Sequence, residues 1–516
     1  MIRCASRSIG YGTIDREHEV FVTNFQDVRV TVMGLGHFGG GVGAVQYLLQ
    51  QGARVTVTDL QTAEQLDDSL SRIDTASLAG LVLGQHREED FTQTDLVVAS
   101  PAVPPNNRFL QAARDAGIPV TSEMALFWER CQARKLVVTG STGKSTTATL
   151  IRDCLAAAGW SVELGGNIGR SLLPQVASFT PDDWVILELS SFQLASLDAL
   201  KPQPDLTVVT NLFPNHLDWH GSFESYEAAK QTACAWQTTS NIAVLNADDP
   251  LLPLWPTDAR VIWFGRECWR DRPGVVIEDQ HLVVRTAQGG WKIELSDLAP
   301  ALQTAHGLKD VAAALATVLV GLQVPIEKIV EPLKTFPGLP HRFQSIGTRS
   351  GRQFINDSKA TVPESSISAL ESISAPIYLI AGGKDKGLEL TEFARCIHSR
   401  VKGVALIGET APRLKQLLIE ESRSARQSGQ NPRRSARDEA LDWIELAPSL
   451  AEAMQWICSR SEPGDVVLLS PGCASQGEFI NFEDRGNRFR ELAETFGESE
   501  TENPGPFKSS GDAVNR

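Results

Sequence analysis

The chain has 516 residues, of which 42% are hydrophobic and 22% charged, and its formal net charge is −15 at pH 7. This length exceeds one hydrophobic core, so about two to four domains are expected, and the negative charge argues against a nucleic-acid partner. The eight cysteines are scattered without a Cys-x-x-Cys pair, and no run of about eighteen apolar residues predicts a membrane span. We therefore expect a cytoplasmic globular protein in a reducing compartment.

The first block of the chain alternates strands and helices, which predicts a parallel, doubly wound sheet. The predicted strands are residues 28–33, 54–58 and 96–99. The turn Gly34-x-Gly36-x-x-Gly39 follows the first of them, Asp59 ends the second and Ser100 follows the third. Glycines at this spacing, with an acidic residue about twenty positions later, match the dinucleotide fingerprint of nicotinamide-dependent dehydrogenases. The same geometry can hold any diphosphate-linked nucleotide, so both interpretations stay open at this point.

The second block begins with a strand over residues 136–139 that runs into the sequence GSTGKST at 140–146. An apolar helix follows, and a strand, a glycine-rich turn and a helix in this order are typical of a phosphate-binding loop. Lys144 would neutralise the β- and γ-phosphates, and Ser145 would offer its hydroxyl to Mg²⁺. The loop is shorter than the common form, because Val138 stands where the first glycine is usual. We predict that this block binds a nucleoside triphosphate.

Further polar residues follow the next strands of the second block. The predicted strands are residues 184–188, 206–210 and 242–245, followed by a β-rich stretch at 261–297 and a helix at 306–316. Glu188 ends a buried strand, at the edge where α/β sheets hold ligands, and is a candidate to hold Mg²⁺ or its water. His216 follows the next strand at the same edge, whereas the pattern around Lys230 indicates only a charged residue on an amphipathic helix.

The third block begins after the linker at 337–340 and repeats the α/β pattern. Its predicted strands are residues 377–380, 404–407 and 466–469. Four polar segments follow strands or turns, at 340–343, 356–361, 382–387 and 470–475, and their cationic groups suit phosphates and an acidic substrate. Residues 421–438 are rich in Ser, Arg, Gln and Asn, which predicts a mobile insertion, and the polar tail predicts disorder.

Taken together, the motifs resemble the Mur ligases of peptidoglycan synthesis. The motifs are GSTGKST, Asn167-Ile-Gly, ELSSFQ, NHLDWHGSFESYEAAK, PHRF, NDSKAT and SPGCAS, in the same order along residues 28–496. GLPHRF, NDSKAT and SPGCAS with NFEDRGNRF favour the member that adds D-glutamate to UDP-N-acetylmuramoyl-L-alanine. The resemblance implies an ATP-dependent amide ligase that acts through an acyl phosphate, with Mg²⁺ at two sites, and we expect a monomer.

The resemblance also implies an α/β fold of three domains: a Rossmann-like N-terminal domain, a central P-loop ATPase-like domain and a Rossmann-like C-terminal domain. We place an N-terminal extension at 1–27, the UDP-substrate domain at 28–126, the ATP domain at 127–336, the amino-acid domain at 337–497 and a disordered tail at 498–516.

Site residues are carried over from the family motif by motif. The implied ATP contacts are Gly140, Ser141, Thr142, Gly143, Lys144, Ser145, Thr146, Arg342, Asp357 and Lys359. The implied UDP-substrate contacts are Gly34, Gly36, Gly39, Asp59, Ser100, Asn167 and His216. The implied D-glutamate contacts are Thr361, Lys386, Ser475 and Phe482. The implied metal ligands are Ser145, Glu188, His216 and Lys230, with Lys230 carbamylated, and the implied catalytic residues are Lys144, Glu188, His216 and Lys230.

The chain departs from the family pattern at several positions. Asn215 stands where many relatives have Asp, and Gly307 and Asp310 replace the two asparagines of a His-Asn-x-x-Asn motif. Another Mur-type or folylpolyglutamate-type ligase is therefore an alternative. A dehydrogenase that uses the Gly34 turn is a more distant one, because it leaves the GKST loop unexplained.

Overall fold

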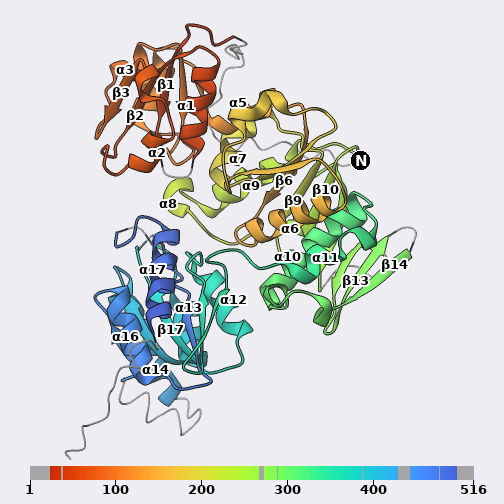
Figure 1. Ribbon diagram of the computed structural model, residues 1–516, viewed down its shortest axis with the longest axis vertical. Helices are drawn as coiled ribbons and strands as arrows, with labels where there is room; N and C mark the ends of the chain where they lie inside the picture. The colour runs from red at the N-terminus through yellow and green to blue at the C-terminus, as the bar shows by residue number, and fades with distance from the viewer. Residues whose placement is uncertain are drawn as a thin grey trace, which may run out of the picture.

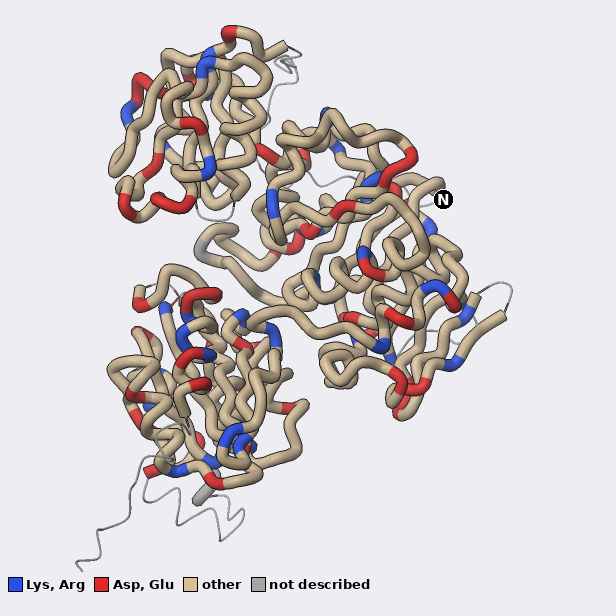
Figure 2. The backbone as a smooth tube through the Cα atoms, in the orientation of Figure 1, with Lys and Arg blue, Asp and Glu red and all other residues tan. Residues whose placement is uncertain are grey.

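A computed structural model describes residues 24–36, 39–266, 272–286, 289–385, 387–427, 442–475 and 477–496. Three α/β domains follow one another along the chain (Figure 1), as predicted. Acidic and basic residues are interspersed over all three domains (Figure 2), so the negative charge is not confined to one segment. No helix among the described residues is long and apolar enough to cross a membrane. Most of the expected extensions, at 1–23 and 498–516, lie outside the described residues.

The first domain is built on a parallel five-stranded sheet in the order β3-β2-β1-β4-β5. Its strands are β1 (Arg29–Met33), β2 (Arg54–Asp59), β3 (Gly80–Leu83), β4 (Leu96–Ala99) and β5 (Val120–Thr121). Its helices are α1 (Gly40–Gln50), α2 (Asp67–Ser71), α3 (Glu89–Thr92), α4 (Arg108–Asp115) and α5 (Glu123–Arg130). The sheet order reverses beside β1, so the turn after β1 lies at the ligand-binding edge of a doubly wound fold.

The central domain contains a nine-stranded sheet in the order β14-β13-β12-β11-β10-β9-β6-β8-β7. Its strands are β6 (Arg134–Thr139), β7 (Val162–Gly166), β8 (Trp184–Glu188), β9 (Leu206–Val209), β10 (Ile242–Asn246), β11 (Arg260–Gly265), β12 (Gly274–Ile277), β13 (His281–Thr286) and β14 (Gly289–Glu294). Its helices are α6 (Lys144–Ala157), α7 (Ser191–Leu197), α8 (Leu217–His220), α9 (Phe223–Ala235), α10 (Ala305–Leu315), which continues as the π-helix Ala316–Gly321, and α11 (Val330–Thr335). Among the described strands of this sheet, only the pairs β12–β13 and β13–β14 are antiparallel.

Alternating residues of the central strands face two helical layers. Leu136 and Val138 of β6 pack with the layer that contains α6 and α10, whereas Val137 between them packs with the layer that contains α7 and α9. This is the two-residue period of a strand that is buried on both faces. The carboxyl ends of β6, β8 and β9 therefore meet at one edge, between the two helical layers.

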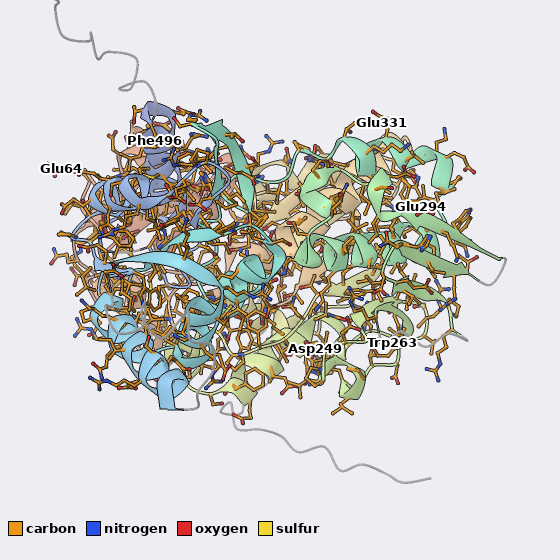
Figure 3. All side chains as sticks on the ribbon, turned by 90° about the horizontal axis from the view of Figure 1, so that it is seen from below. Glu64, Asp249, Trp263, Glu294, Glu331 and Phe496 are labelled. Carbon is orange, nitrogen blue, oxygen red and sulfur yellow. The ribbon has the colours of Figure 1, made fainter. Side chains whose placement is uncertain are left out.

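The third domain carries a six-stranded sheet in the order β15-β16-β20-β17-β18-β19, in which only β15 is antiparallel. Its strands are β15 (Gln344–Arg349), β16 (Arg352–Asn356), β17 (Ile377–Gly382), β18 (Val401–Ile407), β19 (Ile444–Leu446) and β20 (Val466–Leu469). Its helices are α12 (Pro363–Ser372), α13 (Thr391–Arg400), α14 (Ala411–Gln427), α16 (Leu450–Arg460) and α17 (Phe482–Thr495). Phe496, labelled in Figure 3, packs on Phe354 and fixes the end of α17 against β16.

One expectation for the third domain was wrong in part. Residues 421–427, expected to begin a mobile insertion, belong to helix α14. The reason is local, because Leu414, Leu418 and Ser422 recur every four residues and are buried along one side of the helix, which continues the helical pattern into this segment. The rest of the expected insertion, from residue 428, lies outside the described residues.

The first two domains share a packed boundary. One hydrophobic cluster runs from β1 and α1 to the 3₁₀ helix Leu173–Ser178 and to β8. At its edge, a Cβ atom added to Gly43 would overlap the side chain of Ser171. Glycine at position 43 therefore permits the close approach of α1 to the central domain.

Candidate functional site

The phosphate loop joins β6 to α6, as the sequence predicts. Gly140 has φ 140° and Gly143 has φ 82°, conformations that favour glycine. Both also lie against neighbouring side chains, because an added Cβ would overlap Thr210 at the first position and Asp310 at the second. The Thr142 carbonyl accepts hydrogen bonds from Thr210 Oγ1 at 2.5 Å and Asn211 Nδ2 at 3.1 Å. The end of β9 thus braces the loop in a fixed shape.

Lys144, at the start of α6, folds back over this loop. Its Nζ donates hydrogen bonds to the carbonyls of Gly140 at 2.8 Å and Ser141 at 3.0 Å. Burial lowers the pKa of Lys144 to about 8, although the nearby Glu188 favours the charged form. An added anion at the loop would raise this pKa and hold the ammonium charged.

Glu188 lies at the carboxyl end of β8, beside the loop, and is 1% exposed. Its Oε1 accepts a hydrogen bond from Asn167 Nδ2 at 3.0 Å, and its Oε2 is buried with no hydrogen-bond partner in the described structure. Burial opposes ionisation, but the cations of Lys359 and Lys144 hold the pKa of Glu188 below its ordinary value. The site therefore contains an ionised carboxylate with one oxygen free to bind a cation.

The third domain supplies cations to the same edge. Arg342 Nη2 donates a hydrogen bond to Ser145 Oγ at 2.7 Å, which joins the third domain to the phosphate loop. Lys359 Nζ lies 4.7 Å from the centroid of the Phe482 ring, and burial lowers its pKa to about 8. The sequence linked these third-domain residues to the phosphate loop only through the family resemblance, because 197 positions separate Arg342 from Ser145.

Lys230 is buried, contrary to what the helix pattern around it indicates. It is 2% exposed in α9, its Nζ donates to Thr139 Oγ1 at 3.2 Å, and it lies 5.1 Å from the Tyr226 ring centroid. Burial, with a smaller contribution from the positive charge of Lys144, lowers the pKa of Lys230 well below its ordinary value. A lysine on the surface would keep its amine protonated. The packing of α9 against β6 therefore accounts for the lowered pKa of the Lys230 amine.

His216 directly precedes the short helix α8 as its N-cap residue, with a left-handed φ of 54°. Its ring centroid lies 4.7 Å from that of Phe192, the second residue of α7, which follows Glu188 closely in the chain. The aromatic packing fixes the ring on the same side of the sheet as α7.

Five of the predicted UDP-substrate residues, Gly34, Gly36, Gly39, Asp59 and Ser100, lie at or beside the turn after β1, whereas Asn167 and His216 lie in the central domain. Gly34, Gly36 and Gly39 all have positive φ, and a Cβ on Gly34 would meet Ser100 at 2.8 Å. Asp59 Oδ2 accepts hydrogen bonds from the N–H groups of Leu35 at 2.8 Å and of Gly36 at 3.2 Å. The carboxylate of Asp59 thus holds the glycine turn in place.

Three of the four residues predicted to bind D-glutamate lie in the described part of the third domain. Ser475 is buried, and Thr361 and Phe482 are half-buried. The fourth, Lys386, lies outside the described residues. Asp357 accepts from Ser470 Oγ at 2.7 Å and from the Phe343 N–H at 3.0 Å, and burial raises its pKa to about 7.

Sequence reasoning missed Arg485, a fully buried guanidinium in α17. It donates to the carbonyls of Ser358 at 2.7 Å and Cys473 at 3.2 Å, and to Ser358 Oγ at 3.0 Å. It therefore ties the NDSKAT and SPGCAS segments together. The sequence offered a signal in NFEDRGNRF, which was used only as a family motif.

Comparisons with known proteins match all three domains. Family models match as "Mur ligase MurD-like, N-terminal domain" at residues 28–122, "Mur ligase middle domain" at 138–270 and "Mur ligase, glutamate ligase domain" at 341–473. Relatives named UDP-N-acetylmuramoylalanine--D-glutamate ligase occur in Roseiflexus sp. (37% identity, 91% of this chain and 98% of the relative) and in Symbiobacterium thermophilum (35%, 90% and 98%).

Solved structures share the fold at low sequence identity. UDP-N-acetylmuramate-alanine ligase from Thermotoga maritima superposes with a TM-score of 0.57 at 16% identity, over 91% of this chain and 99% of that chain. A MurF structure from Acinetobacter baumannii gives a TM-score of 0.55 at 15% identity, over 90% and 93%.

Proposed function

The chain belongs to the Mur ligase family, and on this premise we propose that it joins D-glutamate to UDP-N-acetylmuramoyl-L-alanine with consumption of ATP. The observation that carries the proposal is the convergence of the phosphate loop, Glu188 and two cations of the third domain at one sheet edge. A phosphoryl group can be held and transferred there. The relatives at 33–37% identity bear the name of this activity.

The residues at this edge fit ATP with Mg²⁺. Hard cations prefer carboxylate, hydroxyl and phosphate oxygens, and Glu188 Oε2 is a buried oxygen with no protein partner in the described structure. Ser145 supplies the hydroxyl. The described residues contain no group of three or more His, Cys, Asp or Glu side chains that could hold a metal. Phosphate oxygens of the nucleotide and water would complete the coordination of Mg²⁺. Bound Mg²⁺ would neutralise phosphate charge.

The reaction then follows from the charges at the loop. A carboxylate oxygen of the nucleotide substrate attacks the γ-phosphorus of ATP, the bond to the β-phosphate oxygen breaks, and an acyl phosphate and ADP form. Lys144 and Lys359 offset the negative charge that moves during this transfer. The amine of D-glutamate then attacks the acyl carbon, inorganic phosphate leaves, and the nitrogen loses a proton to give the amide.

Carbamylation of Lys230 is part of the proposal. Carbamate formation needs a neutral amine, and the lowered pKa of this buried lysine supplies one. The product would be an anion with two hard oxygens, close to Thr139 and coupled to Lys144. Such a group, with His216, would form a second Mg²⁺ site. Burial supports this assignment, because it opposes the charge of the ammonium more strongly than the nearby Glu188 favours it, while the ammonium donates to the Thr139 hydroxyl.

The remaining assignments are proposals of the same kind. The UDP substrate contacts Gly34, Gly36, Gly39 and the other residues carried over above, and the domains extend over 28–126, 127–336 and 337–497. D-Glutamate binds among Thr361, Lys386, Ser475 and Phe482 in the third domain. We place the reaction in the cytoplasm, with one chain as the active unit.

The test is phosphate release by the purified full chain, with ATP and Mg²⁺ present in every reaction. We expect release only when UDP-N-acetylmuramoyl-L-alanine and D-glutamate are both present, with L-glutamate, glycine and a diamino acid as comparisons. A folate substrate with L-glutamate tests the related ligase class. Equal release with another amino acid, or release that does not need the UDP substrate, would contradict the proposal.

A further inference from the structure

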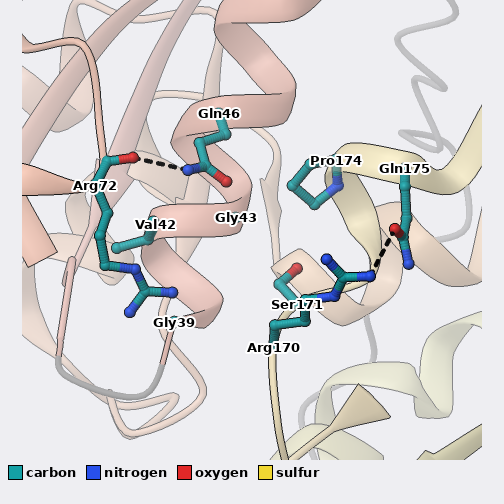
Figure 4. A pocket seen from close by; sticks show the side chains of 9 residues that line it. All are labelled: Gly39, Val42, Gly43, Gln46, Arg72, Arg170, Ser171, Pro174 and Gln175. Atoms are coloured by element: carbon teal, nitrogen blue, oxygen red, sulfur yellow. Dashed lines mark hydrogen bonds between the residues drawn. The ribbon is translucent and has the colours of Figure 1, made fainter. Parts of the chain in front are cut away.

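A cavity of about 250 Å³ lies between the first domain and the central domain (Figure 4). One wall is the amino-terminal half of α1, from Gly39, which precedes its first residue, to Gln46. The opposite wall is the segment of Arg170 and Ser171 and the start of the 3₁₀ helix. Since both domains line the cavity, a ligand there would contact both.

The cavity is lined by two cations from different domains. Arg72 extends from the end of α2 towards Gly39, and Arg170 extends from the central domain (Figure 4). No Asp or Glu is among the residues that line the cavity. Two guanidinium groups in a lining that contains no carboxylate create a locally positive site in a protein whose formal net charge is −15. Such a site favours an anion.

Both guanidinium groups keep donors for a ligand. Arg72 Nη1 lies 3.7 Å from Asp68, whose side chain is 83% exposed, so this ion pair is solvated and weak. Arg170 Nη2 donates to Gln175 Oε1 at 3.2 Å. A guanidinium group has five N–H donors, so most of the hydrogen-bonding capacity of each side chain is available.

Two backbone N–H groups of the glycine turn beside the cavity are already engaged. In a dinucleotide fold, backbone N–H groups of this turn commonly face the diphosphate. Here the N–H groups of Leu35 and Gly36 donate to the Asp59 carboxylate instead. Backbone N–H groups carry no net charge, so a diphosphate next to this turn needs cations to compensate its charge, and Arg72 and Arg170 are the cations that line the adjoining cavity.

We propose that Arg72 and Arg170 bind the diphosphate of the uridine nucleotide, one from each domain. The proposal rests on the proposed function, which makes a uridine diphosphate sugar the substrate. It adds that the diphosphate bridges the two domains. The two arginines then determine affinity for the phosphates, while the uridine moiety is recognised elsewhere.

The test is calorimetric titration of the full chain with uridine, UMP and UDP. We expect Arg72→Gln and Arg170→Gln each to weaken UDP binding by about tenfold or more, the usual effect of losing a charged hydrogen bond. Binding of uridine should not change. The matched controls are Arg54→Gln and Arg260→Gln, which remove exposed arginines at the amino ends of β2 and β11. They should bind all three ligands as the unaltered chain does.

The other possible results separate failure of the proposed function from failure of this inference. If the unaltered chain binds no uridine nucleotide, both the proposed function and this inference fail. If it binds UDP and adds D-glutamate, but both arginine variants bind UDP with unaltered affinity, only this inference fails. If the arginine variants lose affinity for uridine and for UDP equally, the arginines have a structural role, and this inference fails. In a further titration with inorganic phosphate, loss of phosphate binding in the arginine variants with unchanged UDP affinity would indicate a separate anion site, which also contradicts the proposal.

Discussion

Replacing Asp310 with asparagine should stabilise the central domain, and the gain should grow with pH. Asp310 is 3% exposed in α10, against the phosphate loop, and Thr147 Oγ1 lies 3.5 Å from its Oδ1. Burial raises the pKa of Asp310 from 3.8 to about 8, although the nearby Arg342 and Lys309 favour the charged form. In the folded chain the neutral acid is therefore preferred up to about pH 8.

The sign follows from proton linkage. Because the folded pKa is the higher one, the stability contributed by the protonated carboxyl is complete below about pH 3.8 and is lost as pH rises through about 8. The loss is about 1.4 kcal/mol per pH unit within this window, so at pH 8 it reaches about 6 kcal/mol at most. Asparagine keeps the shape of the side chain without an ionisable group, so the variant does not incur this loss.

Thermal unfolding from pH 5 to 8.5 measures the effect. The Tm of Asp310→Asn minus that of the unaltered chain should rise by roughly 3–5 °C per pH unit between pH 5 and 8. Asp153→Asn is the matched control, because it removes a partly exposed carboxylate from α6, where it pairs with Arg152. Its Tm difference should not change with pH. A constant difference for Asp310→Asn, or a lower Tm at pH 8, would refute the argument.

Four further predictions concern the proposed reaction. Lys144→Ala should lower kcat by about two orders of magnitude or more with an unchanged Tm, because it removes charge compensation during phosphoryl transfer; nearly full activity would contradict the loop assignment. Lys230→Ala should be almost inactive and be partly rescued by short carboxylic acids in the phosphate-release assay, whereas an active alanine variant would exclude a carbamate. Ser475→Ala and Lys386→Ala should each cost on the order of 2–3 kcal/mol in kcat/KM for D-glutamate and leave the KM for ATP unchanged; normal D-glutamate kinetics in both would place the pocket elsewhere. Arg342→Lys should lose the 2.7 Å hydrogen bond to Ser145 and therefore raise the KM for ATP. An unaltered KM would show that this contact is dispensable.

The elements predicted from sequence are those with strong local patterns. The strand, loop and helix from 134 to 157 form as expected, because β-branched residues, glycines and an apolar helix face follow one another. Strands such as β5, with two residues, and β7, which ends in two glycines, lack such a pattern and were not predicted. Their pairing depends on neighbouring strands of the sheet.

The site was predictable where residues close in sequence act together, and much less so where distant elements meet. Glu188 at the end of an apolar strand could be assigned from its position alone. The burial of Lys230 could not, because it depends on how α9 packs against β6. Similarly, nothing in the local sequence indicates that Asp310 and Gly143 are in contact, or that Arg485 joins two loops of the third domain.

The close contact of Gly43 with Ser171 has a consequence for how the chain can vary. At this point α1 can approach the central domain closely because residue 43 has no Cβ atom. Any larger residue at position 43 would overlap the side chain of Ser171 and push the two segments apart. Graded substitution of this position, from alanine to valine, would open the boundary by increments. The size of the residue at position 43 therefore limits how closely α1 can approach the segment around Ser171.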